Sequence, residues 1–179
     1  RKKEEAKVEK MLQRFEEMHP GIILGWIREH TIDFRCLDEE KQREKEEKEE
    51  GAEEKIPQRA YLDFVIWFKH RVIILEVDEN QHRSYPAGCD VSRMVNVMSS
   101  LHMGSAAIGT DGDERANAVQ KVRWIRYNPN GYSIGGEKQN TSTKKRETAL
   151  FDLLLKEPAQ KTGVVFAYYD ADYDGNTFC

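Results

Sequence analysis

Cysteines are few in this chain, and apolar runs long enough to cross a membrane are absent. The three cysteines, Cys36, Cys89 and Cys179, are widely separated and form no CxxC pair. They predict neither a disulfide framework nor a structural zinc site. No apolar run reaches the roughly 18 residues of a membrane span, and the amino end is charged rather than signal-like. We therefore expect a soluble, intracellular protein in a reducing compartment, nuclear or cytoplasmic, with no membrane partner.

Motifs that bind phosphate or calcium are also missing. The glycines within residues 104–112 form no phosphate-cradling loop. Asp170, Asp172 and Asp174 match the start of an EF-hand loop, but the chain ends before the bidentate glutamate that such a loop needs. A weak cation site stays open there, and an EF-hand is excluded. Because the chain begins with Arg1 rather than Met, we expect an excised or processed fragment.

An excess of positive charge, common in DNA-binding proteins, is missing as well. The formal net charge is -4. Residues 38–55 contain ten acidic and five basic residues, a net of -5, so the rest of the chain carries +1. This leaves room for a local basic face. Its candidates, most of which are more simply solubilising surface groups, are Arg59, Arg71, Arg83, Arg93, Arg123, Arg126, Lys144, Lys145 and Arg146.

Length and composition predict one domain. With 179 residues, of which 39% are hydrophobic, the chain is long enough for one core and too short for two. We expect a single domain over residues 1–179. A charge-rich excursion at residues 35–55 is expected to be either a solvated helix or a mobile loop.

Two neighbouring apolar runs carry the strongest structural signal. Residues 61–68 and 71–77 are rich in Val, Ile, Phe and Trp. They are apolar on both alternations, which predicts central strands covered on both faces. If Lys69 and His70 form a two-residue hairpin turn, that turn fixes the register of the two strands.

Acidic side chains interrupt these runs at positions that converge. In the register of the hairpin, Asp63 lies opposite Glu76, and Asp78 shares the face of Glu76. Like charges so close raise one another's pKa unless they share a cation, and oxygen ligands favour Mg²⁺ or Mn²⁺. His82 follows at the mouth of such a site, where an imidazole can take a proton from water. The simpler alternative is that the acids are solvated strand ends and that His82 is structural.

The same residues resemble a known family. Residues 62–64 (Leu-Asp-Phe) and 72–82 (Val-Ile-Ile-Leu-Glu-Val-Asp-Glu-Asn-Gln-His) resemble the core of PD-(D/E)XK nucleases. The likeness is to the branch of very-short-patch-repair endonucleases and their homing-endonuclease relatives. It continues more weakly through residues 89–94 and 124–129.

The resemblance implies a restriction-endonuclease-like fold, DNA as the partner, and Asp63 and Glu76 as metal-binding acids. The superfamily usually has a lysine two residues after the second acid, where this chain has Asp78. Many relatives in the repair-type branch lack that lysine and use histidine. By that likeness Asp78 is a further metal ligand and His82 the proton-transfer group.

The remaining pattern predicts the other elements. Helices are expected over residues 4–18, 90–103 and 143–157, a short apolar segment over 22–27, strands over 121–128 and 163–169, and a flexible loop over 132–142. Together they predict an α/β fold with a mixed central sheet of four or five strands and helices on both faces. Relatives often take another acid from an amino-terminal helix, for which Glu9, Glu16 and Glu17 qualify. A solvated helix face is the preferred interpretation of these three.

The leading functional hypothesis is a Mg²⁺- or Mn²⁺-dependent endonuclease that hydrolyses DNA phosphodiester bonds. The three acids would hold the metal, His82 would transfer protons, and Arg93 would contact phosphate. Further nucleic-acid contacts are expected from Arg59 and Arg126. Two alternatives remain. One is a catalytically inactive, nuclease-derived nucleic-acid-binding module, and the other is a small-molecule metal hydrolase without affinity for DNA.

Overall fold

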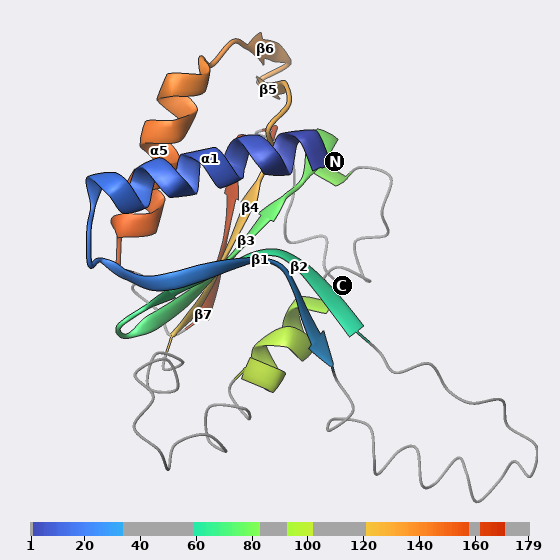
Figure 1. Ribbon diagram of the computed structural model, residues 1–179. Coiled ribbons are helices and arrows are strands. Elements are labelled where there is room, and N and C mark those ends of the chain that lie inside the picture. The colour runs from blue at the N-terminus through green and yellow to red at the C-terminus, as the bar shows by residue number, and fades with distance from the viewer. Residues whose placement is uncertain (1, 34–58, 83–92, 102–120, 158–161, 171–179) are drawn as a thin grey trace, which may run out of the picture.

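Five strands in the described part of the chain form one mixed sheet (Figure 1). The computed structural model describes residues 2–33, 59–82, 93–101, 121–157 and 162–170. The strands, in the spatial order β1-β2-β3-β4-β7, are β1 (Ile23–Asp33), β2 (Arg59–Phe68), β3 (Arg71–Val77), β4 (Val122–Tyr127) and β7 (Thr162–Ala167). Pairing is antiparallel from β1 to β3 and parallel from β3 to β7. The predicted mixed sheet of four or five strands is confirmed.

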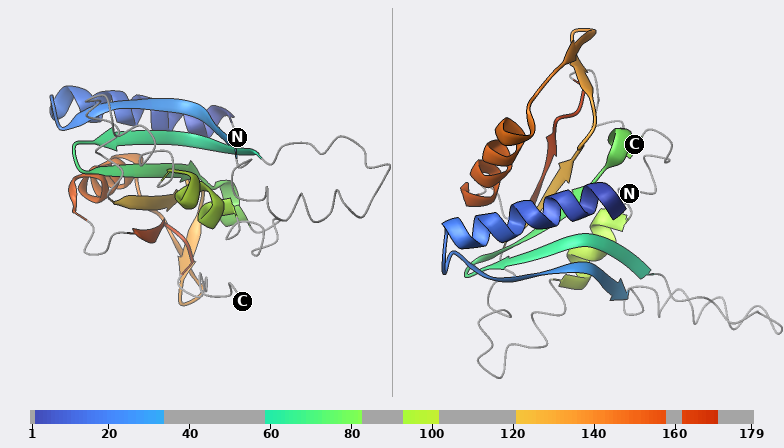
Figure 2. Two further views of the ribbon diagram at one scale, coloured as in Figure 1. Left: turned by 90° about the horizontal axis from the view of Figure 1, so that it is seen from below. Right: turned by 45° about the horizontal axis from the view of Figure 1, so that its top comes forward.

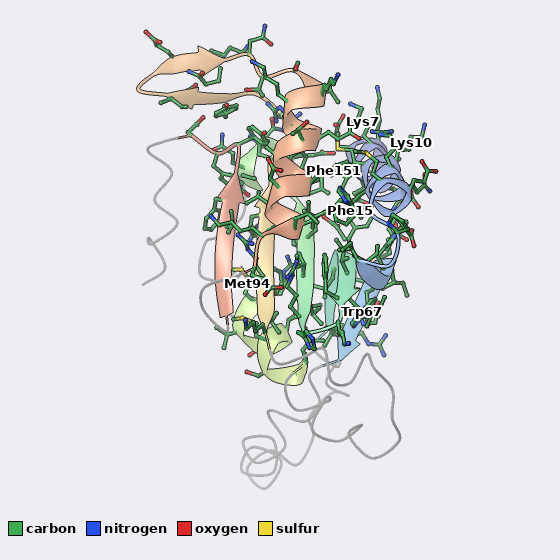
Figure 3. The ribbon with its side chains drawn as sticks, turned by 90° about the vertical axis from the view of Figure 1, so that its left-hand side faces the viewer. Lys7, Lys10, Phe15, Trp67, Met94 and Phe151 are labelled. Atoms are coloured by element: carbon green, nitrogen blue, oxygen red, sulfur yellow. The ribbon has the colours of Figure 1, made fainter. Side chains whose placement is uncertain are left out.

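Helices cover both faces of this sheet, as the sequence predicted. The helices α1 (Lys2–Met18) and α5 (Thr143–Leu155) lie on one face, and the helix of residues 93–101 lies on the other (Figure 1). Phe15 and Phe151 meet edge to face between α1 and α5, with ring centroids 5.2 Å apart (Figure 3). Met94 packs in the second core, on the opposite side of the sheet. The sheet therefore has two apolar cores, one on each face.

Strand β3 is the centre of the fold. All seven of its residues are buried. Ile73 and Leu75 pack in the core under α1 and α5, whereas Val72 and Ile74 pack in the core under residues 93–101. Burial on both faces explains why this run is apolar on both alternations.

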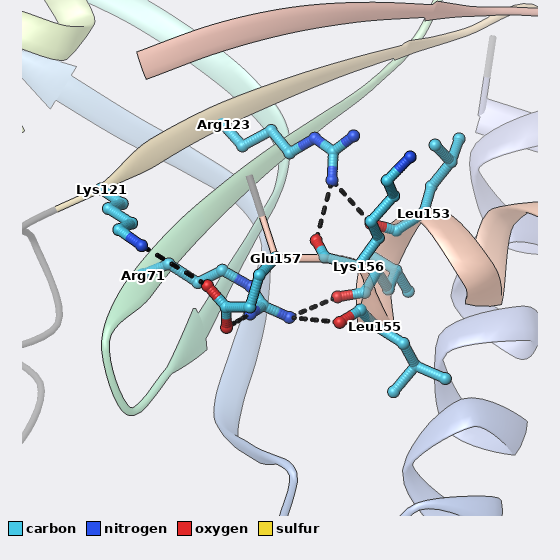
Figure 4. A network of polar contacts seen from close by, with 8 residues as sticks. Arg71, Lys121, Arg123, Leu153, Leu155, Lys156 and Glu157 are labelled. Atoms are coloured by element: carbon cyan, nitrogen blue, oxygen red, sulfur yellow. Dashed lines mark hydrogen bonds and ion pairs between the residues drawn. The ribbon is translucent and has the colours of Figure 1, made fainter. Parts of the chain in front are cut away.

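Two buried arginines fasten α5 to the sheet at the helix carboxyl end (Figure 4). Arg71, the first residue of β3, donates from Nη2 to the carbonyl oxygen of Leu154 at 2.6 Å. Arg123 of β4 donates from Nη1 to the carbonyl oxygens of Leu153 at 3.1 Å and Lys156 at 3.0 Å. These carbonyls have no partner inside the helix, and the cationic groups also favour the negative end of the helix dipole.

The segment predicted as a flexible loop over residues 132–142 instead contains a small hairpin that projects beyond the sheet (Figure 2). Its strands are β5 (Tyr132–Ile134) and β6 (Glu137–Gln139). Gly135 and Gly136 form the turn with φ of 58° and 80°, values that glycine adopts without strain. The loop prediction was therefore wrong, because two glycines that suggested flexibility make a tight turn.

Other boundaries shift without changing the architecture. β1 has eleven residues rather than a short segment at 22–27, because its pairing with β2 continues to Asp33 opposite Arg59. The excursion at residues 35–55 and the loop at 104–112 lie outside the described residues. None of the described helices is long and apolar enough to cross a membrane.

Candidate metal centre

The hairpin of β2 and β3 has the register that the two-residue turn predicts. Pairing begins at Phe68 with Arg71 and runs to Phe64 with Leu75. At the next position of β2, the side chain of Asp63 rather than its backbone forms the hydrogen bond to β3. Its Oδ2 accepts a hydrogen bond of 2.8 Å from the backbone N–H of Val77. Asp63 is 5% exposed and is thus directed at the end of β3.

The backbone is irregular on the other side of Asp63 too. Pairing of β1 with β2 passes from Arg28 with Phe64 to His30 with Leu62. Glu29, between these pairs and opposite Asp63, has φ of 54°, which is rare for a residue with a side chain. Both Leu62 and Phe64 have even numbers, yet they pack in opposite cores. The alternation of side chains along β2 therefore changes at Asp63.

Glu76 is the most deeply enclosed acid of the site. Its side chain is 0% exposed, and its Oε2 lies 3.0 Å from Nη2 of Arg93. Both of its carboxylate oxygens, Oε1 and Oε2, are buried and have no hydrogen-bond partner among the described residues. Burial raises the pKa of Glu76 to about 7, Arg93 opposes this rise, and the negative charges of Asp63 and Asp78 add to it. The structure thus brings the three predicted acids close enough to affect one another.

Asp78 is buried under different partners. Its Oδ2 accepts hydrogen bonds from Nε of Arg126 and from the hydroxyl of Tyr169, and its backbone N–H donates to the carbonyl of Tyr127 at 2.8 Å. Arg126 is 1% exposed and is the register neighbour of Glu76 on the adjacent parallel strand. Asp78 is thereby fixed between β4 and the residues that follow β7.

The predicted nucleic-acid contacts fall in three different settings. Arg59 is exposed at the start of β2, on the same strand as Asp63. Arg93 lies at the edge of the site, with its side chain 23% exposed. Arg126, expected to contact nucleic acid, is instead buried against Asp78. Tyr169 was not singled out from the sequence, although its place at the end of an apolar run beside an acidic stretch was visible there.

Other predicted residues lie elsewhere. The side chain of His82, the last residue of η2 (Glu79–His82), lies outside the described part of the structure. Glu9 pairs with Arg28 of β1 at 2.8 Å, and Glu16 accepts a hydrogen bond from Trp26. Helix α1 covers the opposite face of the sheet from residues 93–101. Glu16 and Glu17 are exposed, as a solvated helix face predicts, whereas Glu9 is half-buried against Arg28.

Strained backbone gathers around the three acids. In the described residues, positive φ at non-glycine positions occurs at Glu29, Asn80, Gln81 and Tyr168. Glu29 lies opposite Asp63, the pair in η2 follows closely after Asp78, and Tyr168 directly precedes the tyrosine that binds Asp78. Such conformations cost on the order of 1 kcal/mol or more each and are concentrated at functional sites.

A cavity of about 330 Å³ lies next to this strained segment. Asn80 and Gln81 form one wall, and Asp170 and the β5–β6 hairpin, with Lys138, form the rest. The backbone N–H of Asp170 donates a hydrogen bond of 3.3 Å to Oε1 of Gln81. The cavity therefore borders the residues that follow Asp78 and Tyr169 in the chain.

Two of the three acids have an arginine partner within the protein. Among the described residues, no group of three or more carboxylate, histidine or cysteine side chains has an arrangement that could hold a metal ion. Arg93 is paired with Glu76, and Arg126 with Asp78. Comparison of the chain with protein-family models, curated proteins and solved structures gives no match. The nuclease resemblance accordingly depends on the motif in the sequence.

Proposed function

We propose that the chain is a metal-dependent nuclease that hydrolyses DNA phosphodiester bonds, with the cation held by Asp63 and Glu76. The observation that carries the proposal is the state of Glu76. This carboxylate is fully buried beside two other acids, and its Oε1 has no hydrogen-bond partner among the described residues. Burying an incompletely compensated carboxylate is costly, and such groups are concentrated at functional sites. A divalent cation would supply the missing positive charge.

The donor set fits a hard cation. Asp63 and Glu76 offer only oxygen atoms, which Mg²⁺ and Mn²⁺ prefer. The hydrogen bond from Val77 orients Asp63 toward β3. Asp78 would join as a third ligand only after release from Arg126 and Tyr169. In the arrangement described here its role is to hold Arg126 beside Glu76.

The residues of the chain would divide the remaining work. A bound cation would polarise the phosphate and lower the pKa of a water molecule. Arg93, at the edge of the site, would neutralise charge on the phosphate. His82 would accept a proton from the attacking water or return one to the leaving oxygen. Arg59, exposed on the strand of Asp63, would contact the nucleic-acid backbone.

The two ion pairs support a second candidate function. Glu76 is already paired with Arg93, and Asp78 occupies the position where the nuclease family usually has lysine. A chain that neutralises its own acids in this way could retain the fold and the affinity for nucleic acid without turnover. The second candidate is therefore a catalytically inactive, nuclease-derived nucleic-acid-binding module.

Nicking of supercoiled plasmid tests the two candidates. Wild-type protein, Asp63→Asn, His82→Ala and the control Glu137→Gln would be incubated with plasmid and Mg²⁺ or Mn²⁺. Glu137 is exposed on the β5–β6 hairpin. We expect nicking by wild type and Glu137→Gln, and loss of nicking by the other two variants.

Each outcome selects one function. Equal nicking by all four proteins would contradict the enzymatic proposal, because it would indicate a contaminating nuclease. No nicking, together with salt-dependent DNA binding, would favour the inactive module. No DNA affinity even at low salt would favour a metal hydrolase that acts on small molecules.

A further inference from the structure

The contact between Arg93 and Glu76 is incomplete. Its atoms Nη2 and Oε2 are 3.0 Å apart, and Nη1 donates to the carbonyl oxygen of Tyr61 at 2.9 Å. The remaining donor of Arg93, Nε, is buried without a hydrogen-bond partner among the described residues, as is Oε1 of Glu76. Strong arginine–carboxylate pairs use two parallel hydrogen bonds. This contact is an ion pair that meets no hydrogen-bond geometry, and it leaves both oxygens of Glu76 and Nε of Arg93 without a hydrogen-bond partner among the described residues.

The second arginine of the site is held far more firmly. Arg126 is 1% exposed, and its partner Asp78 also accepts a hydrogen bond from Tyr169. Arg93 has a side-chain exposure of 23% and reaches Glu76 from the helix of residues 93–101. Its guanidinium carbon lies 6.0 Å from the ring centroid of Trp124. Of the two arginines, only Arg93 is exposed enough to leave its carboxylate partner and move into solvent.

With all three acids ionised, the charges of the site balance when a divalent cation replaces Arg93. Asp63, Glu76 and Asp78, when ionised, contribute three negative charges, and Arg93 and Arg126 contribute two positive charges. The sum is -1. With a divalent cation in place of Arg93, three negative charges meet three positive charges and the sum is zero. Neutrality matters here because charges in a buried site are poorly screened.

We propose that Arg93 is an internal counter-ion of Glu76, that a divalent cation displaces it, and that the released guanidinium then binds the phosphate of the nucleic acid. This inference depends on the proposed metal site. It adds an order of events in which the cation binds first and the anion-binding group becomes available as a result. By thermodynamic reciprocity, bound DNA must then also increase the affinity for the cation.

Arginine side-chain resonances test the displacement directly in the unmodified chain. Mg²⁺ would be added to ¹⁵N-labelled wild-type protein while the Nε–Hε signals are followed, with Arg93→Lys used to assign the signal of Arg93. We expect the Arg93 signal to shift and saturate with Mg²⁺, and the Arg126 signal to shift much less. Saturable Mg²⁺ binding with an unmoved Arg93 signal overturns the inference and leaves the metal site intact.

Metal affinity supplies the second readout. Mn²⁺ binding would be measured by titration calorimetry on wild type, Arg93→Gln, Arg93→Lys and the control Arg14→Gln, which removes a charge from an exposed pair with Glu147 on α5. Because the cation no longer competes with a guanidinium, we expect Arg93→Gln to bind Mn²⁺ roughly five- to ten-fold more tightly than Arg14→Gln. Arg93→Lys, which keeps the charge, should stay close to wild type. Equal affinity of all four proteins overturns the inference.

DNA binding in Ca²⁺ tests the second half of the inference. We expect Ca²⁺ to increase the affinity of wild type for a short DNA duplex severalfold, and Arg93→Gln to lose that increase. An unchanged increase in Arg93→Gln contradicts the transfer of Arg93 to phosphate. Absence of Mg²⁺ and Mn²⁺ binding in both wild type and Arg93→Gln would instead contradict the proposed metal site itself, so the two failures are distinguishable.

Discussion

Glu76 and Arg126 lie side by side on adjacent parallel strands, and each forms an ion pair with a residue from another part of the chain. Glu76 pairs with Arg93 of the helix at residues 93–101, and Arg126 pairs with Asp78 at the end of β3. Tyr169, which follows β7, adds a hydrogen bond to Asp78. The two ion pairs connect β3 with β4 and with the helix, and the Tyr169 hydrogen bond adds the segment after β7. We therefore expect the residues of the candidate site to contribute to the stability of the fold.

Removal of Arg126 is expected to destabilise the protein strongly. Arg126→Met leaves Asp78 buried without its ion-pair partner, a change that costs about 3–5 kcal/mol of unfolding free energy. Tyr169→Phe removes one hydrogen bond to the same carboxylate and should cost about 1–2 kcal/mol. The exposed pair of Lys7 and Glu4 provides the control, since Lys7→Met should cost less than about 1 kcal/mol. Urea unfolding measures all three, and equal losses would contradict the assignment.

The pH dependence of stability should reveal Glu76. Its pKa of about 7 in the folded protein exceeds the ordinary 4.5, so the folded chain retains a proton that the unfolded chain releases. The stabilisation from this retained proton is complete below about pH 4.5 and is lost as the pH rises through about 7, by on the order of 3 kcal/mol.

Glu76→Gln should lack this loss, although Asp63, Asp78 and Arg93 still face the position. Urea unfolding at pH 5 and pH 8, in the presence of a chelator, measures the effect. We expect wild type to lose more stability than Glu76→Gln between the two values. Parallel pH profiles would show that Glu76 titrates normally.

Lysine should not replace Arg71, the residue of β3 that binds the carboxyl end of α5, without loss of stability. Arg71→Lys keeps a positive charge near Glu157 but loses the planar guanidinium that donates to the carbonyl oxygen of Leu154. We expect a loss of about 1.5–3 kcal/mol in unfolding free energy, typical of hydrogen bonds from charged groups. Lys121→Arg, which alters the more exposed partner of Glu157 at 3.7 Å, serves as the control and should change stability by less than about 0.5 kcal/mol. Similar losses of unfolding free energy in the two variants would show that Arg71 contributes only its charge and not its hydrogen bonds to the helix.

Local patterns predicted much of this molecule, and tertiary pairing decided the rest. The turn at Lys69 and His70 gave the register of β2 and β3, because a two-residue loop leaves only one alignment. The alternation in β4 placed Arg126 on a defined face, but the partner of that residue depends on the parallel register with β3. A single sequence therefore does not distinguish a buried, paired arginine from one that contacts a phosphate.

The same limit applies to the carboxylates. The convergence of Asp63 and Glu76 follows from the hairpin alone, whereas the approach of Arg93 depends on a helix far along the chain. The backbone irregularity at Glu29 was equally hidden, since positive φ in a strand has no sequence signal when the residue is not glycine.

The conformation of Glu29 gives the last prediction. With φ of 54°, this residue occupies a region that costs roughly 1–2 kcal/mol for a side chain and nothing comparable for glycine. Glu29→Gly should therefore be neutral or stabilising by up to about 1 kcal/mol, whereas Thr31→Gly, exposed on the same strand with ordinary φ, should cost about 0.5–1 kcal/mol. Glu29→Val favours extended backbone and should displace Asp63 on the neighbouring strand, so that Mn²⁺ affinity falls while Glu29→Gly retains it. Equal Mn²⁺ affinity of the Val and Gly variants would show that the backbone conformation at Glu29 does not position Asp63.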